Sequence, residues 1–297
     1  MRKLLLAALL FIATGANALT VEKEIEQLEY ALEFQYTVLV ETGSSAEDIA
    51  TMERIYQNIH ERRSFLEARS AAGETRYLVV NKGEYNMKVI EDGQLVIQEK
   101  VIVGKPARPT PEFSDNIKYI VINPYWNVPK NLARKDVVPK FNRIRKKHGI
   151  DEMYTAIEEG GYRFFVDEVE LDPLTIDFTQ YNRRSKLPFK IRQDPGSHNS
   201  LGVIKFMFPN RYNVYIHDTP TRGLFDREER NYSSGCVRLR NPANLAAYLM
   251  NTTTPDILDM IDNTEYRDKW LRIPEPLPIH IVNWSITVTE DGIKLGE

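Results

Sequence analysis

We expect a mainly β protein of the α+β class, in which short strands form a sandwich or a barrel-like core. Three observations predict this class. Apolar and polar residues alternate over short stretches after residue 76, turn residues separate those stretches, and helix-like spacing is concentrated before residue 73. A hydrophobic content of 42% and a charged content of 27% fit a globular chain with its own core.

The first 18 residues have the pattern of an export signal. Arg2 and Lys3 precede an apolar run over 4–12, and Ala16-Asn17-Ala18 forms a small-residue cleavage site. The run is shorter than the roughly 20 apolar residues that a membrane-spanning helix needs. We therefore expect a signal peptide at 1–18, an exported protein located in the periplasm, and no membrane span.

Residues 19–75 are expected to form a helical N-terminal piece. Val21, Ile25, Leu28 and further apolar residues recur at three- and four-residue steps up to Gly43. Ser44-Ser45-Ala46-Glu47 then has the composition of a capping box that begins a second helix. We expect this piece to pack on the main domain.

A single β domain is expected over 76–297. It begins with a strand at 76–81 and a hairpin on Asp92-Gly93, and it closes with a strand at 278–288. Between about 130 and 190 the pattern changes to a basic run with helical potential, and strands resume afterwards. This stretch therefore looks like an insertion in the β domain.

Charge and cysteine content exclude several function classes. The chain has 39 basic and 42 acidic residues, a net charge of −3, so no overall basic field would recruit nucleic acid. One cysteine excludes an internal disulfide and a Cys-rich metal site. The five histidines are scattered, and no H-E-x-x-H, P-loop or G-x-G-x-x-G motif occurs. We expect no metal and no organic cofactor.

The segment that carries chemistry ends at the lone cysteine, Cys236. A thiol is a good nucleophile only as the thiolate, so it needs a base or a cationic neighbour. His217 ends a predicted strand and could supply that base, and amides at the Gly235–Cys236 turn could stabilise an oxyanion. A lone His or Cys is more often structural, but the polar flanks of this cysteine favour nucleophilic catalysis.

The pattern from His217 to Ser-Ser-Gly-Cys-Val-Arg at 233–238 resembles the L,D-transpeptidase (YkuD-type) catalytic domain. The resemblance covers most of 76–290 and extends to further blocks that resemble a large periplasmic subgroup, at 103–106, 110–114, 123–129 and 201–210. It implies a YkuD-like β-sandwich core and a substrate-capping insertion at the stretch noted above. A glycan-binding domain often found upstream in this subgroup has no counterpart here.

The resemblance also implies a mechanism. Cys236 would attack the bond between meso-diaminopimelate and D-alanine in a tetrapeptide stem of peptidoglycan, with His217 as the base. The resulting acyl-enzyme would pass to an amine on a second stem, which gives a 3–3 cross-link and makes the enzyme a target for carbapenems. The backbone around Ser234, Gly235 and Cys236 would line the oxyanion site.

Further residues are expected to contribute to the site. Arg238 would either hold a substrate carboxylate or brace the loop, and Tyr215 and Trp126 would line the cleft. Asp218 would orient the imidazole through its carboxylate or its carbonyl, and we favour the carbonyl because successive side chains on a strand point to opposite faces. Many family members carry a second histidine where this chain has Ser234, so His217 would act alone.

Two alternative functions remain open at this point. Water could resolve the thioester, which would make the protein an L,D-carboxypeptidase of the same fold. Alternatively the domain could bind the cell wall without catalysis, with Cys236 inert. The acceptor could be another stem, a free D-amino acid or an outer-membrane lipoprotein, and other cell-wall synthases are candidate partners.

Overall fold

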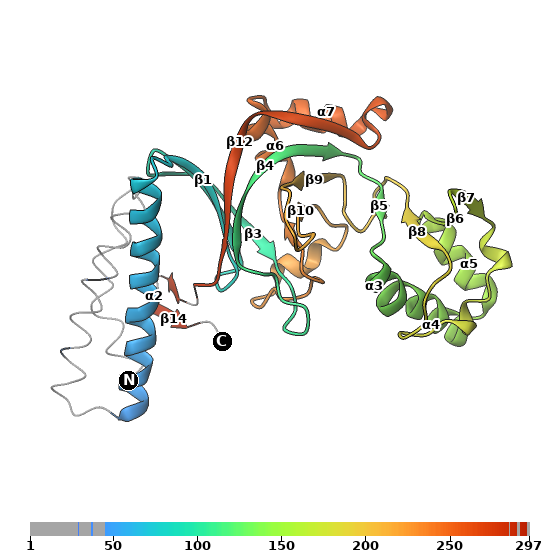
Figure 1. Cartoon of the computed structure of the whole chain (residues 1–297), viewed down its shortest axis with the longest axis horizontal. Coiled ribbons are helices and arrows are strands. Elements are labelled where there is room, and N and C mark those ends of the chain that lie inside the picture. Colours follow the sequence, from blue (N-terminus) through green and yellow to red (C-terminus); the bar gives the residue numbers. More distant parts are fainter. Residues whose placement is uncertain (1–28, 30–36, 38–44, 285, 290–291, 296–297) are drawn as a thin grey trace.

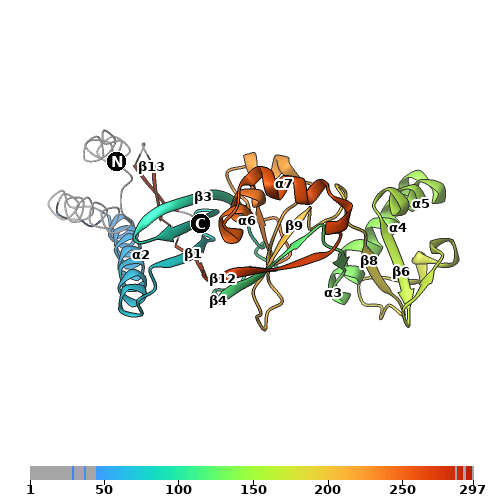
Figure 2. The same ribbon diagram turned by 90° about the horizontal axis from the view of Figure 1, so that it is seen from above.

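The computed structural model describes residues 29, 37, 45–284, 286–289 and 292–295. A β-barrel occupies the middle of the molecule, a long helix lies on one side of it and a small mixed lobe lies on the other (Figures 1 and 2). The signal peptide expected at 1–18, and the first of the two expected N-terminal helices apart from residues 29 and 37, lie outside the described residues.

Eight strands pair into one closed barrel. Of the two arrangements expected, a sandwich or a barrel-like core, the strand pairing forms the barrel. Their order around the barrel is β1-β12-β4-β9-β10-β11-β3-β2, and β1 pairs with β2 to complete the circle. The pairs β1–β12 and β10–β11 are parallel, and the remaining pairs are antiparallel. The strands are β1 (Arg76–Asn81), β2 (Asn86–Glu91), β3 (Gln94–Ile102), β4 (Phe113–Ile122), β9 (Ile204–Met207), β10 (Ile216–His217), β11 (Val237–Leu239) and β12 (Lys269–Val282).

The expected hairpin is present between β2 and β3. Glu91 pairs with Gln94 across a two-residue turn, in which Asp92 and Gly93 both have positive φ (50° and 75°). A turn of this kind matches the right-handed twist of the flanking strands and favours Asp-Gly. The mainly β, α+β class and the helical N-terminal piece are confirmed.

The closing strand differs from the expectation in its limits. β12 begins at Lys269 and ends at Val282, whereas 278–288 was expected. Pro274, Pro276 and Pro278 lie within it, and the register of β12 against β4 shifts between Arg272 and Leu277. Because a proline cannot donate to a ladder, prolines in strands are found at bulges and edges, and this irregularity accommodates part of the run.

Alternation along the strands sends one set of side chains into the barrel. Leu78, Val89, Ile120, Phe206 and Leu239 are among those with no exposed area. The helices α6 (Pro242–Met250) and α7 (Thr254–Asp262) cover one end of this core, and they follow Asn241-Pro242 as expected. The connecting 3₁₀ turns are η4 (Arg222–Asp226) and η5 (Thr264–Tyr266), and a separate hairpin forms from β13 (Ile286–Thr289) and β14 (Gly292–Leu295).

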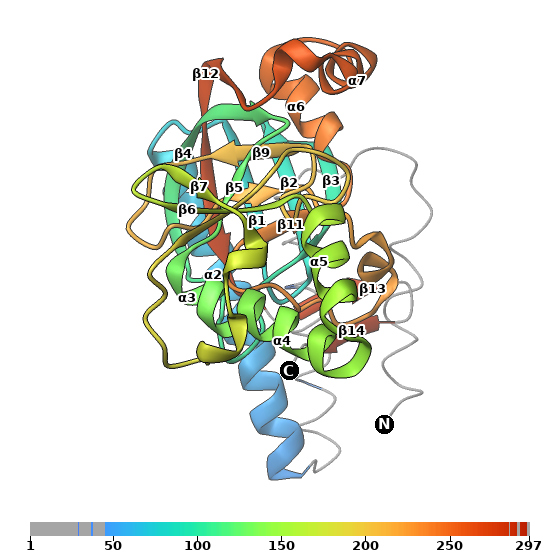
Figure 3. The same ribbon diagram turned by 90° about the vertical axis from the view of Figure 1, so that its right-hand side faces the viewer.

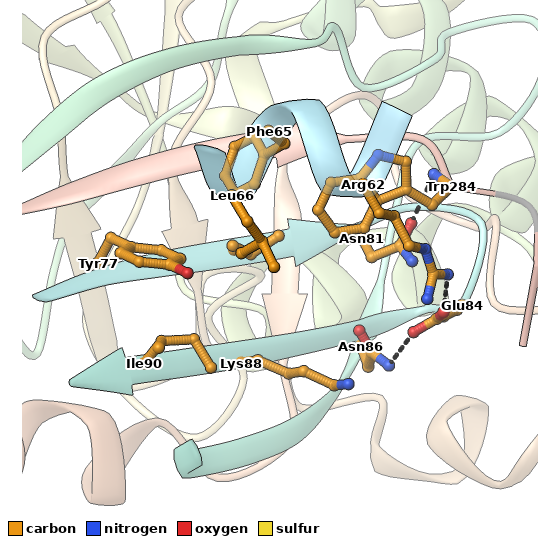
Figure 4. Close-up of a pocket in the computed structure, with 11 residues that line it drawn as sticks. Arg62, Phe65, Leu66, Tyr77, Asn81, Glu84, Asn86, Lys88, Ile90 and Trp284 are labelled. Carbon is orange, nitrogen blue, oxygen red and sulfur yellow. Dashed lines mark hydrogen bonds and ion pairs between the residues drawn. The ribbon is translucent and has the colours of Figure 1, made fainter. Parts of the chain in front are cut away.

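The long helix α2 (Ala46–Ala71) packs against the outside of β1 and β2. Its first turn has a capping box, one residue later than the expected Ser44-to-Glu47 box: Ser45 and Asp48 each accept from the other's backbone N–H. Figure 4 shows Phe65 and Leu66 of this helix over the two strands, beside Trp284. Arg62 forms a buried ion pair with Glu84, which joins the helix to the β1–β2 turn. Among the described residues no helix has both the length and the apolar character to cross a bilayer.

The lobe is built from the chain between β4 and β9 (Figure 3). Its core contains Phe141, Phe164, Phe178 and Phe189, whose rings lie 5.3–6.3 Å apart in the contacting pairs. This core is separate from that of the barrel. The lobe comprises β5 (Trp126–Asn127), α3 (Lys130–Leu132), the π-helical turn η1 (Ala133–Val137), α4 (Val138–His148), α5 (Ile150–Glu159), β6 (Tyr162–Val166), β7 (Val169–Leu171), the 3₁₀ turns η2 (Pro173–Thr175) and η3 (Phe178–Gln180), and β8 (Lys190–Gln193).

Candidate active site

A cavity of about 470 Å³ lies between the barrel and the lobe and contains the candidate nucleophile and base. The barrel contributes Cys236, His217, Tyr215, Arg238 and the loop at 233–234, and the lobe contributes Trp126, Leu132 and Asp136. The cavity thus brings together all the predicted site residues except Asp218, which lies behind His217, and Gly235, which lies within the loop.

Strand register places the charged residues around the imidazole. His217 on β10 is paired with Lys205 on β9 and with Arg238 on β11. Residues paired across neighbouring strands project to the same face, so His217 has a cation on each side. On the same face Tyr215 lies beside Cys236, because the N–H of Val237 donates to the carbonyl of Tyr215 (3.1 Å).

The imidazole of His217 is buried and held by backbone. Its Nδ1 hydrogen-bonds the carbonyl of Asp218, while the Asp218 carboxylate accepts from the N–H of Val203 (3.0 Å) and pairs with Arg222. Burial lowers the pKa of His217 to about 3, and the charges of Arg238 and Lys205 act in the same direction, against hydrogen bonds to the backbone of Asp218 and Leu201. The ring is therefore neutral at physiological pH, with Nε2 as its basic atom.

The thiol of Cys236 is protonated in the resting site. Burial raises its pKa, against hydrogen bonds from the backbone and hydroxyl of Tyr215 and the charges of Lys205 and Arg238. Its Sγ lies 3.9 Å from the carbonyl oxygen of Asn213, an acceptor that suits S–H rather than a thiolate. Among the described residues no hydrogen bond joins Sγ to the imidazole. A neutral thiol and a neutral imidazole thus share the cavity.

A tight loop holds the carbonyl of Asn213 in this position. Asn213 has a φ of 54°, a left-handed conformation that asparagine tolerates better than most residues. The side chain of Asn210 fixes the loop by accepting from the N–H of Tyr212 (3.0 Å) and donating to the carbonyl of Val214 (2.7 Å).

The loop at 233–236 is held by hydrogen bonds that alter its expected role. Ser233 Oγ donates to the carbonyl of Cys236 and accepts from the N–H of Gly235 (3.1 Å). The expectation that the Gly235 amide lines the oxyanion site is therefore wrong for its N–H, since that donor is already engaged. The N–H groups of Ser234 and Cys236 meet no acceptor among the described residues, so they are the available donors.

Arg238 lies at the cavity with its charge uncompensated. Within the described part of the chain no carboxylate pairs with it, and its buried Nε has no hydrogen-bond partner. Burial lowers its pKa, which is the effect expected of a cation removed from water without a counter-ion. No hydrogen bond or ion pair among the described residues gives its guanidinium a bracing role.

Two aromatic residues link the lobe to the nucleophile. The hydroxyl of Tyr215 hydrogen-bonds both Cys236 and Trp126, and burial is the main cause of the raised pKa of this phenol. The Nζ of Lys205 lies 4.2 Å from the centre of the Tyr215 ring. Tyr215 therefore contacts the sulfur directly, which is a closer involvement than the cleft-lining role that we expected.

Two further residues hold the catalytic loop: Arg108 donates to Ser234 Oγ (3.0 Å), and Thr110 Oγ1 donates to the carbonyl of Gly235 (2.8 Å). Sequence reasoning missed both of them, together with Lys205 and Asn213. Only Lys205 left a usable signal, since it is the one charged residue within the otherwise apolar predicted strand at 203–208. The other three act through backbone groups or across long separations. Among the described residues no group of three or more His, Cys, Asp or Glu side chains could hold a metal ion.

Comparison with known proteins places this site in context. The family model YkuD, described as the L,D-transpeptidase catalytic domain, matches residues 75–269. A curated Haemophilus influenzae protein, provisionally described as an L,D-transpeptidase, is 34% identical over 173 residues. The match spans 58% of this chain and 33% of that relative, so this chain covers about a third of the relative's length.

Solved structures of the same description are more distant. L,D-transpeptidase 3 from Mycobacterium tuberculosis with a faropenem-derived adduct is 14% identical, with a TM-score of 0.33 over 70% of this chain and 60% of that one. The Enterococcus faecium catalytic domain acylated by ertapenem is 12% identical, with a TM-score of 0.29 over 67% and 96%. At these scores the likeness carries no weight, and the family match depends on the family model.

Proposed function

Because the chain belongs to the YkuD family of L,D-transpeptidase catalytic domains, we propose that it forms 3–3 cross-links in peptidoglycan through a Cys236 acyl-enzyme. The single observation that carries this proposal is that Cys236 and His217 line the same cavity, with the backbone N–H of Cys236 unengaged among the described residues. The substrates are tetrapeptide stems that end in meso-diaminopimelate and D-alanine.

The first half-reaction forms a thioester. The Cys236 sulfur attacks the carbonyl carbon of the diaminopimelate–D-alanine bond while its proton moves to Nε2 of His217. The N–H of Cys236 stabilises the oxyanion of the tetrahedral intermediate, an effect commonly worth a few kcal/mol. The C–N bond then breaks, and the imidazolium returns the proton to the amine of the departing D-alanine.

The second half-reaction releases the enzyme. A side-chain amine of a neighbouring stem gives a proton to His217 and attacks the thioester carbonyl. The C–S bond breaks, the sulfur recovers a proton from the imidazolium, and the product is an amide between two stems. With water in place of the amine, the same steps release a tripeptide, which is the carboxypeptidase alternative.

The protonation state of the resting pair suits proton transfer during attack rather than a preformed ion pair. With a pKa of about 3, His217 is unprotonated over the whole physiological range but is a weak base in the empty site, and burial keeps the thiol from ionising early. A substrate carboxylate against Arg238 would offset the positive charge that opposes imidazolium formation. The base would then become stronger when substrate is bound.

The lobe is proposed to cap the bound stem. Trp126, Leu132 and Asp136 of the lobe line the same cavity as the catalytic loop, so a peptide in the cavity would contact both parts. Enclosure of this kind excludes bulk water, which favours an amine over water as the acceptor. The site of action would be the periplasm, reached through the signal peptide expected at 1–18, and other cell-wall synthases are candidate partners.

Purified disaccharide-tetrapeptide, incubated with the protein and analysed by mass spectrometry, tests the proposal. We expect cross-linked dimers that have lost one D-alanine, and no products from Cys236→Ala. Tripeptide monomers alone would instead indicate the carboxypeptidase. Unchanged substrate, together with no covalent adduct from imipenem or ertapenem, would support a binding module and contradict the proposal.

A further inference from the structure

We propose that Thr110 is the positioning residue that directs the N–H of Cys236 into the cavity as the oxyanion donor. Thr110 lies in the loop between β3 and β4, 1% exposed and far in sequence from the catalytic loop. The inference rests on the proposed function, because it concerns the oxyanion formed in that reaction.

The hydroxyl of Thr110 acts both as a hydrogen-bond acceptor and as a donor. Its Oγ1 accepts from the N–H of Gly104 (2.9 Å) and donates to the carbonyl of Gly235 (2.8 Å). These assignments are unambiguous, because a backbone N–H can only donate and a carbonyl can only accept. The 104–110 loop closes tightly on itself: a Cβ at Gly104 would lie 2.6 Å from the nitrogen of Thr110. Outside the catalytic loop, Thr110 is held by Gly104 and by Lys82, whose Nζ donates to its carbonyl (2.9 Å).

The bond to Gly235 determines the direction of the next N–H. A trans peptide unit is planar, so the C=O of Gly235 and the N–H of Cys236 point in opposite directions. With the carbonyl held against Thr110, the N–H of Cys236 must point away from Thr110, and it meets no acceptor among the described residues. Gly235 has a φ of 121°, and a glycine has wide conformational freedom because it lacks a Cβ. The orientation of the Gly235–Cys236 peptide therefore needs a restraint from outside the loop.

The flanking peptide units are restrained by other residues. The N–H of Gly235 donates to Ser233 Oγ and the carbonyl of Cys236 accepts from it, while the N–H of Val237 donates to Tyr215 (3.1 Å). The Gly235–Cys236 peptide is therefore the one unit between them that depends on Thr110. Its restraint is a side chain more than a hundred residues away in the sequence.

Two substitutions separate the hydroxyl from the shape of the side chain. Thr110→Val keeps the shape and removes the hydrogen bonds, whereas Thr110→Ser keeps the hydroxyl and removes a methyl group. For each variant we would compare the rate at which imipenem acylates Cys236 with the rate at which iodoacetamide alkylates it, both by mass spectrometry of the intact protein. Acylation passes through an oxyanion, and alkylation by displacement of iodide does not.

We expect Thr110→Val to slow acylation by about 10- to 100-fold, somewhat less than deletion of an oxyanion donor, and to leave alkylation within about twofold. Thr110→Ser should acylate within a few-fold of the wild type. Equal slowing of both reactions would show that Thr110 only holds the sulfur, and no slowing would show that it is dispensable; either result overturns the inference.

Misfolding of the variant and failure of the proposed function can each be told apart from failure of the inference. If Thr110→Val lacks the wild-type circular dichroism spectrum, Thr110→Ala removes the hydroxyl without added bulk, and the same pair of rates decides. If the wild type forms no imipenem adduct, the proposed function fails together with this inference. An adduct that forms equally fast in wild type and Thr110→Val refutes the role of Thr110 alone.

Discussion

The buried, neutral state of His217 predicts how stability depends on pH. In the unfolded chain this side chain has a pKa near 6.5, and in the fold its pKa is about 3. Between these values the unfolded state binds a proton that the folded state does not, so the free energy of unfolding falls as the pH drops below 6.5. Above pH 7 the imidazole is neutral in both states and contributes no pH dependence.

The loss in free energy of unfolding is set by the pH range between the unfolded and folded pKa values of His217. Each pH unit below 6.5 costs about 1.4 kcal/mol until the folded pKa is reached. At about pH 4.5, two units below, His217 should therefore lower the free energy of unfolding by about 3 kcal/mol relative to pH 8. Other groups also titrate in this range, so the effect must be measured as a difference between two proteins.

His217→Asn is the matched variant, because its amide N–H can replace Nδ1 as donor to the carbonyl of Asp218. Urea denaturation followed by circular dichroism at both pH values gives the free energies. We expect the wild type to lose about 3 kcal/mol more than the variant on acidification. Equal losses would show that His217 protonates normally in the fold, and they would refute the neutral resting pair.

Three further predictions concern side chains at the cavity. Cys236→Ala should abolish imipenem adduct formation with an unchanged circular dichroism spectrum, and a loss of fold would indicate a structural cysteine. Arg238→Gln should raise KM for tetrapeptide by about tenfold. Amidation of the substrate carboxylates should raise KM by a similar factor in the wild type, and it should cause no further increase in the variant. Arg108 donates to Ser234 Oγ (3.0 Å) and pairs with Asp136 of the lobe. Arg108→Met should therefore raise KM more than it lowers kcat, and unchanged steady-state kinetics would contradict this coupling.

The fold class and the chemistry of the site could be predicted because their signals are local. Alternation of apolar residues gives strands, and Asp92-Gly93 specifies a hairpin turn whichever strands it joins. Likewise, a lone cysteine with polar flanks downstream of a strand-end histidine indicates nucleophilic chemistry before any contact is known. These features depend on residues a few positions apart, which the chain itself keeps together.

The tertiary structure alone decided how the site is held and charged. Lys205 and Arg238 flank His217 because three strands align in one register, and Thr110 bonds Gly235 although 125 positions separate them in the sequence. The neutral state of thiol and imidazole follows from burial, which depends on everything packed around them. Register, burial and long-range hydrogen bonds arise only when distant segments meet, so no stretch of sequence by itself encodes them.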